Sequence, residues 1–277
     1  MKWRQRAVRI WAYTSLLLIV AIIVFMFAYI FAIGSKSISW QFLTDVPRGG
    51  IIGSAGGILP AIVGSLYFTL VACALGAVLG IATAIYLVFY CKSRRVAALM
   101  QTAIQGVAGV PSIVLGLFGY TLLVLRMGLG KSILAGGIAQ GIMILPFIEV
   151  RAEKVMREFP SDLINASYAL GVSKLHTIGK IVLPGCKGGL VSGIILGGCY
   201  AVGATAPLIF TGAVINSPVP TTMLEPAMAL PYHLFMLLTQ GTSTENAYGT
   251  AFVLMAIVLV SNGLAIFYAN RRSKLWK

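Results

Sequence analysis

The sequence predicts an all-α protein that crosses a membrane six times. Of its 277 residues, 58% are hydrophobic and 10% are charged, and the mean hydropathy is +0.93. Soluble domains carry about 25% charged residues, so this composition indicates several membrane spans surrounded by lipid. The net charge of +14 comes from short runs of Lys and Arg beside apolar stretches, not from one basic domain. This distribution argues against a nucleic-acid partner.

Six apolar stretches are long enough to cross a bilayer, which takes about 20 helical residues. The first, residues 10–33, follows the basic N-terminal segment 1–9. Its apolar run is longer than the ~7–15 residues of a signal-peptide core, so we expect an uncleaved anchor and keep a cleaved signal as the alternative. A loop at 34–58 leads to a core of five further spans, residues 59–270. We expect these spans at 59–90, 103–125, 132–150, 190–214 and 248–269, and the second of these is interrupted by Gly109-Val110-Pro111.

The distribution of Lys and Arg predicts the orientation of the chain. Of the 21 Lys and Arg residues, 17 lie in segments 1–9, 91–102, 151–189 and 271–277, and four lie in the loops between them. The positive-inside rule therefore predicts cytoplasmic N- and C-termini and a cytoplasmic loop at 151–189. The outer loop 215–247 contains four prolines, so we expect a structured segment that either docks a binding protein or plugs the bundle.

Small residues recur at four-residue spacing in two of the spans. Gly76 and Gly80 form one such pair, and Gly193 and Gly197 form another. This spacing lets helix backbones approach closely, and we expect tight packing there. The alternative is that glycine is simply commoner in membrane helices than in soluble ones.

Residue types that carry chemistry are scarce. The chain has no Walker A loop, its four cysteines and two histidines show no metal-ligand spacing, and no nucleophile–base pair is evident. We therefore expect no catalytic residue and no metal site. Glu149 is the acid nearest to a span interior, and we expect a boundary residue paired with Arg151 or Lys154. A membrane chain without an energy-coupling site of its own should draw its energy from a partner.

Residues 161–184, inside the long inner loop, predict two short helices joined by a turn. Asp162 and Ser173 are placed to cap the two helices. Gly171 suits the turn because it has no Cβ to penalise positive φ, and Pro184 is expected to end the second helix. The pair is either a docking element or an amphipathic helix that lies at the lipid headgroups.

This segment resembles the loop motif of ABC importer permeases, which reads Glu-Ala-Ala, three residues, Gly, nine residues, Ile-x-Leu-Pro. Here Asn165-Ala166-Ser167 precedes Gly171, and Ile181-Val182-Leu183-Pro184 follows after nine residues. The run GATAPLIFT, residues 203–211, adds a similarity to the PstA-type permeases of phosphate-specific (Pst) importers. The likeness is strongest over residues 145–215, and the six-span layout extends it over the whole chain.

The resemblance implies the architecture of a type I ABC importer permease in the cytoplasmic membrane of a bacterium or archaeon. It implies alternating-access import, driven by a separate ATPase dimer that binds ATP and Mg, so this chain is expected to bind no cofactor. A second, related permease chain and an extracytoplasmic solute-binding protein are the other implied partners. The implied ATPase-coupling residues are Asn165, Ala166, Tyr168, Leu170, Gly171, Leu175, Ile181, Leu183 and Pro184.

The chain departs from the family pattern in two regions, the inner-loop motif and the fifth span. The motif's acid is Asn165 here, which cannot form a charge pair. In the fifth span the family reads Arg-x-x-Gly-Glu-Thr-Ala-Pro, whereas this chain has Tyr200 and Ala204 in place of the Arg and Glu, and no Lys or Arg occurs from 188 to 270. Either the partner permease supplies the charge, or the solute or the mechanism differs. The alternatives are an importer of another oxyanion or solute, an ion-coupled secondary transporter and a membrane enzyme.

Polar and helix-breaking residues remain in the fifth span as candidates for a translocation pathway. Pro207 is expected to leave the Gly203 carbonyl unpaired one turn earlier. The alternative is that these residues only kink and pack the helix. The candidate pathway residues are Tyr200, Gly203, Thr205, Pro207 and Thr211.

Overall fold

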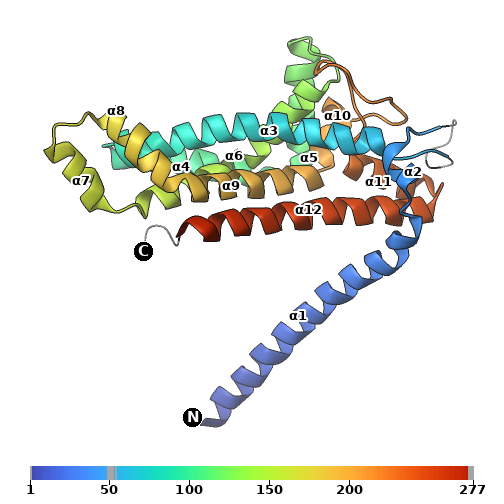
Figure 1. Cartoon of the computed structure of the whole chain (residues 1–277), viewed down its shortest axis with the longest axis horizontal. Helices are drawn as coiled ribbons and strands as arrows, with labels where there is room; N and C mark the ends of the chain where they lie inside the picture. The colour runs from blue at the N-terminus through green and yellow to red at the C-terminus, as the bar shows by residue number, and fades with distance from the viewer. Residues whose placement is uncertain (1, 49–52, 54, 274–277) are drawn as a thin grey trace.

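The computed structural model describes residues 2–48, 53 and 55–273, and helices dominate it (Figure 1). Three short segments, η1 to η3, are π-helical. No strand occurs within those ranges, so the all-α prediction is confirmed. In chain order the elements are α1 (Lys2–Ser37), α2 (Trp40–Thr44), α3 (Leu59–Ile85), η1 (Tyr86–Tyr90), α4 (Arg94–Gly109), α5 (Ser112–Gly119), η2 (Tyr120–Arg126), α6 (Ile133–Arg157), α7 (Ser161–Ala169), α8 (Lys174–Thr177), η3 (Ile178–Val182), α9 (Leu183–Gly203), α10 (Ala206–Thr211), α11 (Leu230–Gln240) and α12 (Thr244–Ser273).

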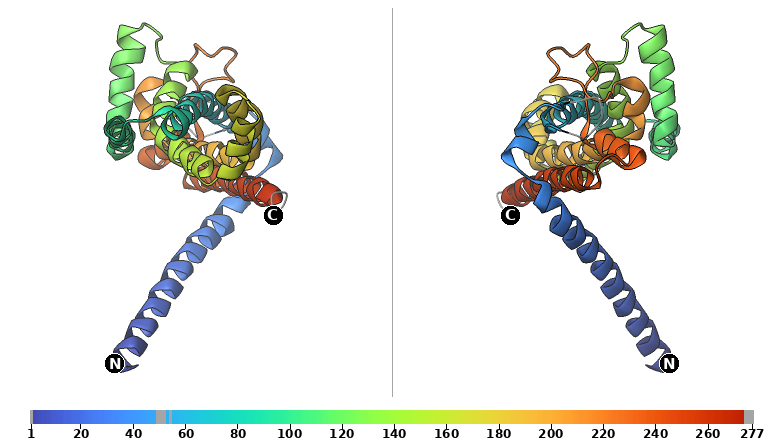
Figure 2. Two further views of the ribbon diagram at one scale, coloured as in Figure 1. Left: turned by 90° about the vertical axis from the view of Figure 1, so that its left-hand side faces the viewer. Right: turned by 90° about the vertical axis from the view of Figure 1, so that its right-hand side faces the viewer.

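Five helical stretches are long and apolar enough to cross a membrane, and a bent pair makes the sixth. The bent pair consists of α4 and the α5–η2 helix, which meet at 97°. Figure 2 shows the α5–η2 helix, in green, standing across the bundle. The bend falls at Gly109-Val110-Pro111, where the sequence predicts an interruption of the span at 103–125. Pro111 forces the break because it disfavours helical backbone at Val110, which is extended with φ −72° and ψ 127°.

The centre of the bundle is built from α3, α6 and α9, which pack closely through glycine. Ile148 of α6 lies between the other two helices. A Cβ placed on Gly76 would lie 3.0 Å from Ile148 Cδ1, and one on Gly197 would lie 3.0 Å from Ile148 Cγ1. The predicted tight packing at the spaced glycines is confirmed, because side chains larger than hydrogen would separate these helices.

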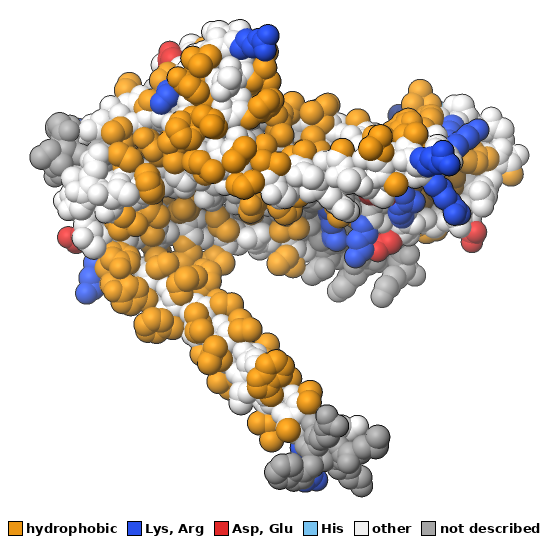
Figure 3. Space-filling model, turned by 180° about the vertical axis from the view of Figure 1, so that it is seen from behind, with side chains coloured by type: hydrophobic (Ala, Val, Ile, Leu, Met, Phe, Trp, Pro, Cys, Tyr) orange, Lys and Arg blue, Asp and Glu red, His pale blue; other side chains and the backbone are white. Residues whose placement is uncertain are grey.

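The first helix, α1, lies mostly outside this bundle and points away from it (Figures 1 and 3). Only its last turns contact α12, where Phe31 and Phe252 pack with their ring centroids 5.5 Å apart. Leu17 and Phe25 are 72% and 70% exposed, and residues 10–33 of the helix carry no charged side chain. This surface suits lipid or another membrane chain, not water.

Several predicted boundaries are shifted. Pro184 does not end a helix, because α8, η3 and α9 form one continuous helical run, Lys174–Gly203, in which the proline lies two residues after the π-helical segment η3. The fifth span ends at Gly203 instead of Val214. The loop 215–247 contains α11, and α12 begins inside it at Thr244. The loop 34–58 contains α2, which Ser39 caps by accepting from the Phe42 amide at 3.0 Å.

We expect Gly80→Leu to destabilise the bundle, by about 1–3 kcal/mol or more, since overpacking a close helix contact strains both helices. A Cβ at position 80 would lie 3.2 Å from the Glu149 amide nitrogen and 3.4 Å from the Leu145 carbonyl oxygen, and neither backbone atom can yield cheaply. The measurement is the thermal unfolding midpoint in detergent. Gly106→Leu is the control, because among the described atoms nothing lies within 4 Å of a Cβ there. Equal midpoints for both variants would contradict the packing account.

Candidate functional site

Two short helices, α7 and α8, project as a unit from one end of the bundle, where Lys and Arg side chains also gather (Figures 1 and 3). Gly171 joins them with φ +77°, the left-handed conformation that the sequence predicted there. The predicted capping is wrong in detail. The residue that precedes α7 is Pro160, Asp162 lies in the first turn, and among the described residues the Ser173 side chain makes no cap bond. An acid in the first turn still favours the helix through its dipole.

Buried polar contacts hold the two helices in one arrangement. The Ser167 and Thr177 hydroxyl oxygens lie 2.9 Å apart and share a hydrogen bond, with both side chains almost fully buried. The Val172 amide donates to the Ser167 carbonyl at 3.2 Å and closes the turn. A buried bond with both partners satisfied favours one geometry, so the pair can move as a rigid element.

Lys174 connects this unit to the end of the α3–η1 helix. Its ammonium donates to the Phe89 carbonyl and lies 4.5 Å from the centroid of the Tyr90 ring. A carbonyl bond together with a cation–π contact resists displacement of either partner. Sequence reasoning missed Lys174 because its partners lie more than eighty residues earlier in the chain.

The outermost surface of the unit is apolar. Leu170 and Leu175 are 84% and 76% exposed, and Tyr168 is 39% exposed. Such side chains at the tip of a rigid projection are typical anchors for a protein partner. Of the other predicted coupling residues, the exposed ones are Asn165, Ala166, Gly171 and Pro184, and the half-buried ones are Ile181 and Leu183.

A break between α9 and α10 interrupts the fifth span at Ala204 and Thr205. The helix does not continue through Pro207 as expected, because Pro207 stands in the first turn of α10, where no amide donor is needed. Gln140 of α6 supplies a hydrogen-bond donor to the backbone carbonyls at this break. Its side-chain amide donates to the Ala201 carbonyl at 3.0 Å and to the Ala204 carbonyl at 3.3 Å.

The predicted pathway residues divide into two groups. Tyr200 is 51% exposed and its ring centroid lies 4.8 Å from that of Phe147, while Gly203 is exposed and Thr205 half-buried. Pro207 and Thr211 are buried, and the Thr211 hydroxyl donates to the Pro207 carbonyl at 2.6 Å. In this conformation Tyr200, Gly203 and Thr205 are at least partly exposed at the surface of the chain, and Pro207 and Thr211 pack inside it.

The predicted pairing of Glu149 with Arg151 or Lys154 is wrong. Lys154 lies 3.9 Å from Glu158, and the buried Glu149 side chain lies against Glu153, one turn further along α6. Residues two apart on a helix point to opposite sides, so Glu149 cannot reach Arg151. Within the described chain, Glu149 Oε1 and Arg151 Nε are buried without a hydrogen-bond partner.

We expect Gln140→Leu to weaken the α6–α9 contact, because the Ala201 and Ala204 carbonyls would lose their side-chain donor. A buried acceptor left unsatisfied costs about 1–3 kcal/mol. The unfolding midpoint in detergent should fall, whereas Gln240→Leu, at the exposed end of α11, should leave it unchanged. A midpoint unaffected by Gln140→Leu would show that the break does not need Gln140.

No group of three His, Cys, Asp or Glu side chains that could hold a metal ion occurs in the described ranges.

The family model described as binding-protein-dependent transport system inner membrane component matches residues 76–274 of this chain. A phosphate transport system permease protein PstA 1 of Mycobacterium tuberculosis is 35% identical, over 80% of this chain and 73% of its own. A probable phosphate transport system permease protein PstA of Methanocaldococcus jannaschii is 34% identical, over 74% and 73%.

A probable ABC transporter permease protein YqgI of Bacillus subtilis is 30% identical, over 88% of both chains. Among solved structures, a chain of the inward-facing MetNI methionine ABC transporter matches with a TM-score of 0.64, over 78% of this chain and 95% of that one. Its identity is 16%, so this likeness concerns the fold alone.

Proposed function

Because this chain belongs to the binding-protein-dependent transport system inner membrane component family, we propose that it is the permease subunit of an ATP-driven importer of inorganic phosphate. The chain is a multi-pass membrane permease of the ABC importer type. Relatives named as phosphate permeases, at 34% and 35% identity over most of the chain, support phosphate as the solute. Membership of this family sets aside the alternatives of a secondary transporter and a membrane enzyme.

The proposed mechanism rests on the α7–α8 unit, which projects from the end of the bundle. A partner ATPase, which binds the ATP and Mg, would contact the exposed side chains of Leu170, Leu175 and Tyr168. Movement of this rigid unit would reach α3 through Lys174, and it would reach the broken fifth span through the unbroken η3–α9 helix. Rigid-body movement of these helices would then open the pathway alternately to the two sides of the membrane.

The remaining partners follow from the same proposal. A second, related permease completes the pathway, and an extracytoplasmic binding protein delivers the solute at the side of loop 215–247. The 17 Lys and Arg residues in the segments beside α7 and α8 and at the chain ends support cytoplasmic termini. This chain itself binds no nucleotide or metal in this scheme.

An importer of another oxyanion or solute is the second candidate, because Tyr200 and Ala204 stand where the phosphate branch has Arg and Glu, and the Bacillus subtilis relative's name specifies no solute. The test is uptake of labelled phosphate into proteoliposomes that hold the whole assembly, with sulfate and molybdate as competitors. We expect ATP-dependent uptake that only excess unlabelled phosphate abolishes. Uptake of sulfate or molybdate without phosphate uptake would replace the proposed solute.

A further inference from the structure

A cavity of about 390 Å³ lies between α4, α6 and α9, away from the projecting α7–α8 unit. Most of its lining is apolar, with Phe147 and Leu196 among the contributors, and its polar side chains are Gln105, Arg151 and Lys154. Ligand pockets for small molecules start at about 300 Å³, so there is room for a tetrahedral oxyanion with several waters. The cavity therefore combines an apolar wall with two cations.

Arg151 is the cation deepest along α6, since no Lys or Arg lies between it and Lys131. Its side chain crosses the face of α9 at Gly193, where a Cβ would lie 2.9 Å from Arg151 Cγ. Its Nε is buried and has no hydrogen-bond partner among the described residues. A buried guanidinium N–H without an acceptor is unfavourable, so Arg151 favours a ligand that brings an acceptor to its Nε.

The carboxylates nearest along α6 do not supply that acceptor. Glu153 lies 2.6 Å from Arg157, and it also accepts from Gln101 of α4. Glu158 lies 3.9 Å from Lys154, and Glu149 lies against Glu153, while its position two residues before Arg151 puts it on another side of the helix. Arg151 is thus left for a ligand that arrives from outside the chain.

The cavity is continuous with the face of α9 that carries the predicted pathway residues. Gly193 and Leu196 line the cavity, and Tyr200 and Gly203 follow at three- and four-residue steps, so all four share one side of the helix. Phe147 lines the cavity and packs against Tyr200. An ion passing Tyr200 would meet Arg151 next along the same face.

We infer that this cavity is an oxyanion site on the transport path, in which Arg151 is the principal ligand and Lys154 and Gln105 assist. The planar guanidinium offers paired donors that match the oxygens of a tetrahedral oxyanion. The inference rests on the proposed function for the identity of the ion, but not for the existence of the site. It also supplies, from α6, a cation for a chain that has none from 188 to 270.

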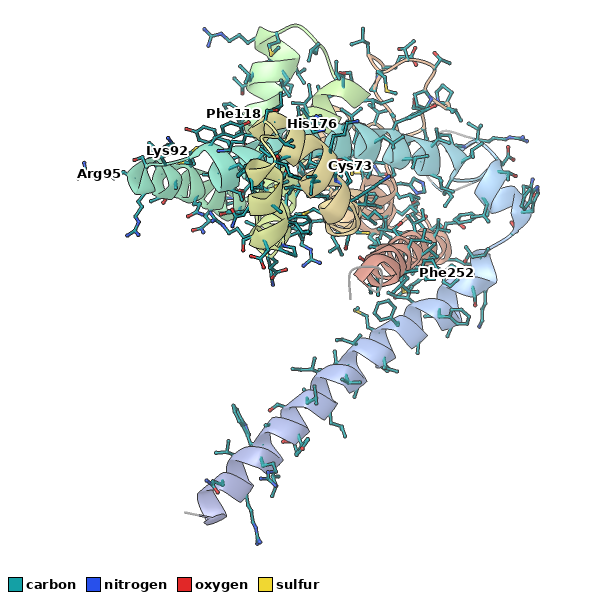
Figure 4. All side chains as sticks on the ribbon, turned by 60° about the vertical axis from the view of Figure 1, so that its left-hand side comes forward. Cys73, Lys92, Arg95, Phe118, His176 and Phe252 are labelled. Atoms are coloured by element: carbon teal, nitrogen blue, oxygen red, sulfur yellow. The ribbon has the colours of Figure 1, made fainter. Side chains whose placement is uncertain are left out.

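The first test is transport by the whole assembly in proteoliposomes. Arg151→Gln should raise the KM for phosphate at least about tenfold, the scale of one charge-assisted hydrogen bond, and Arg151→Lys should fall between it and the wild type. Arg95→Gln is the control, because it removes the same charge from the exposed start of α4, outside the cavity (Figure 4). A KM unchanged by Arg151→Gln would overturn the site.

The second test does not depend on which solute is carried. Ala108→Cys places a thiol on the cavity wall, in a chain whose native cysteines at 73, 91, 186 and 199 are replaced by alanine. An anionic methanethiosulfonate should react about tenfold faster than a cationic one, because Arg151 and Lys154 attract it. Arg151→Gln should remove most of that preference, and phosphate or sulfate should slow the labelling.

Equal reaction rates for the two reagents, with no protection by either oxyanion, would overturn the inference even if phosphate uptake is normal. Anion preference and protection by sulfate alone, in an assembly that takes up no phosphate, would support the site and overturn the proposed solute. The two proposals therefore fail separately.

Discussion

Replacing Gly171 with valine is expected to reduce ATP-driven uptake at least about tenfold while leaving membrane insertion intact. The residue has φ +77°, and left-handed backbone costs an L-residue roughly 1–2 kcal/mol and a β-branched one more. Space is not the obstacle, because in the described structure nothing lies within 4 Å of a Cβ at this position. The turn should therefore relax to another conformation and move Leu170 and Leu175 out of register with the ATPase.

Uptake should fall at least about tenfold, which corresponds to roughly 1.4 kcal/mol of lost coupling. ATP hydrolysis by the assembly should persist, but it should no longer respond to the solute. The measurements are labelled-solute uptake and phosphate release from ATP in the same proteoliposomes, together with the amount of chain recovered from membranes.

Two variants separate backbone strain from added bulk. Gly171→Asn should retain most of the uptake, because asparagine tolerates the left-handed conformation. Gly179→Val adds the same side chain within η3, at a glycine without positive φ and with open space around its Cβ in the described structure, and should be nearly neutral. Normal uptake with Gly171→Val would show that the turn geometry is not part of the coupling.

The features that sequence reasoning predicted depend on residues close together in the chain. The left-handed turn at Gly171 needs only a glycine between two helical segments, and the close approach of α3 and α6 needs only glycines at four-residue spacing. The spans follow from stretches of apolar residues. Each of these signals is local, so each can be read without knowing the tertiary structure.

What the sequence could not predict depends on partners far apart in the chain. Gln140 bonds carbonyls more than sixty residues later, and Lys174 bonds a carbonyl eighty-five residues earlier. The prediction that Pro184 ends a helix is wrong because the proline lies within one continuous helical run, directly beyond the π-helical η3, and no local signal in the sequence indicates that π-helical segment. The unpaired Arg151 was missed because only the structure shows that its Nε is buried without a hydrogen-bond partner among the described residues.

Replacing Leu170 and Leu175 together with alanine should release the ATPase from the permease. The two side chains are 84% and 76% exposed at the tip of a unit that internal hydrogen bonds already hold rigid. Truncating an apolar anchor of an interface costs about 2–4 kcal/mol, so the double variant should weaken binding by at least roughly 100-fold. The measurement is the amount of ATPase that co-purifies with the permease from detergent.

Truncation of the two leucines should not disturb the fold, because most of each side chain lies outside any core and only its exposed surface is removed. Unfolding midpoints should therefore match the wild type even where the ATPase is lost. Lys180→Ala provides the control, since it shortens an exposed side chain on neighbouring η3 without removing an apolar anchor. If the double variant still co-purifies with the full amount of ATPase, the ATPase binds another surface at this end of the bundle. That result would leave Leu170 and Leu175 without a role in coupling, because their exposure serves no contact within the chain.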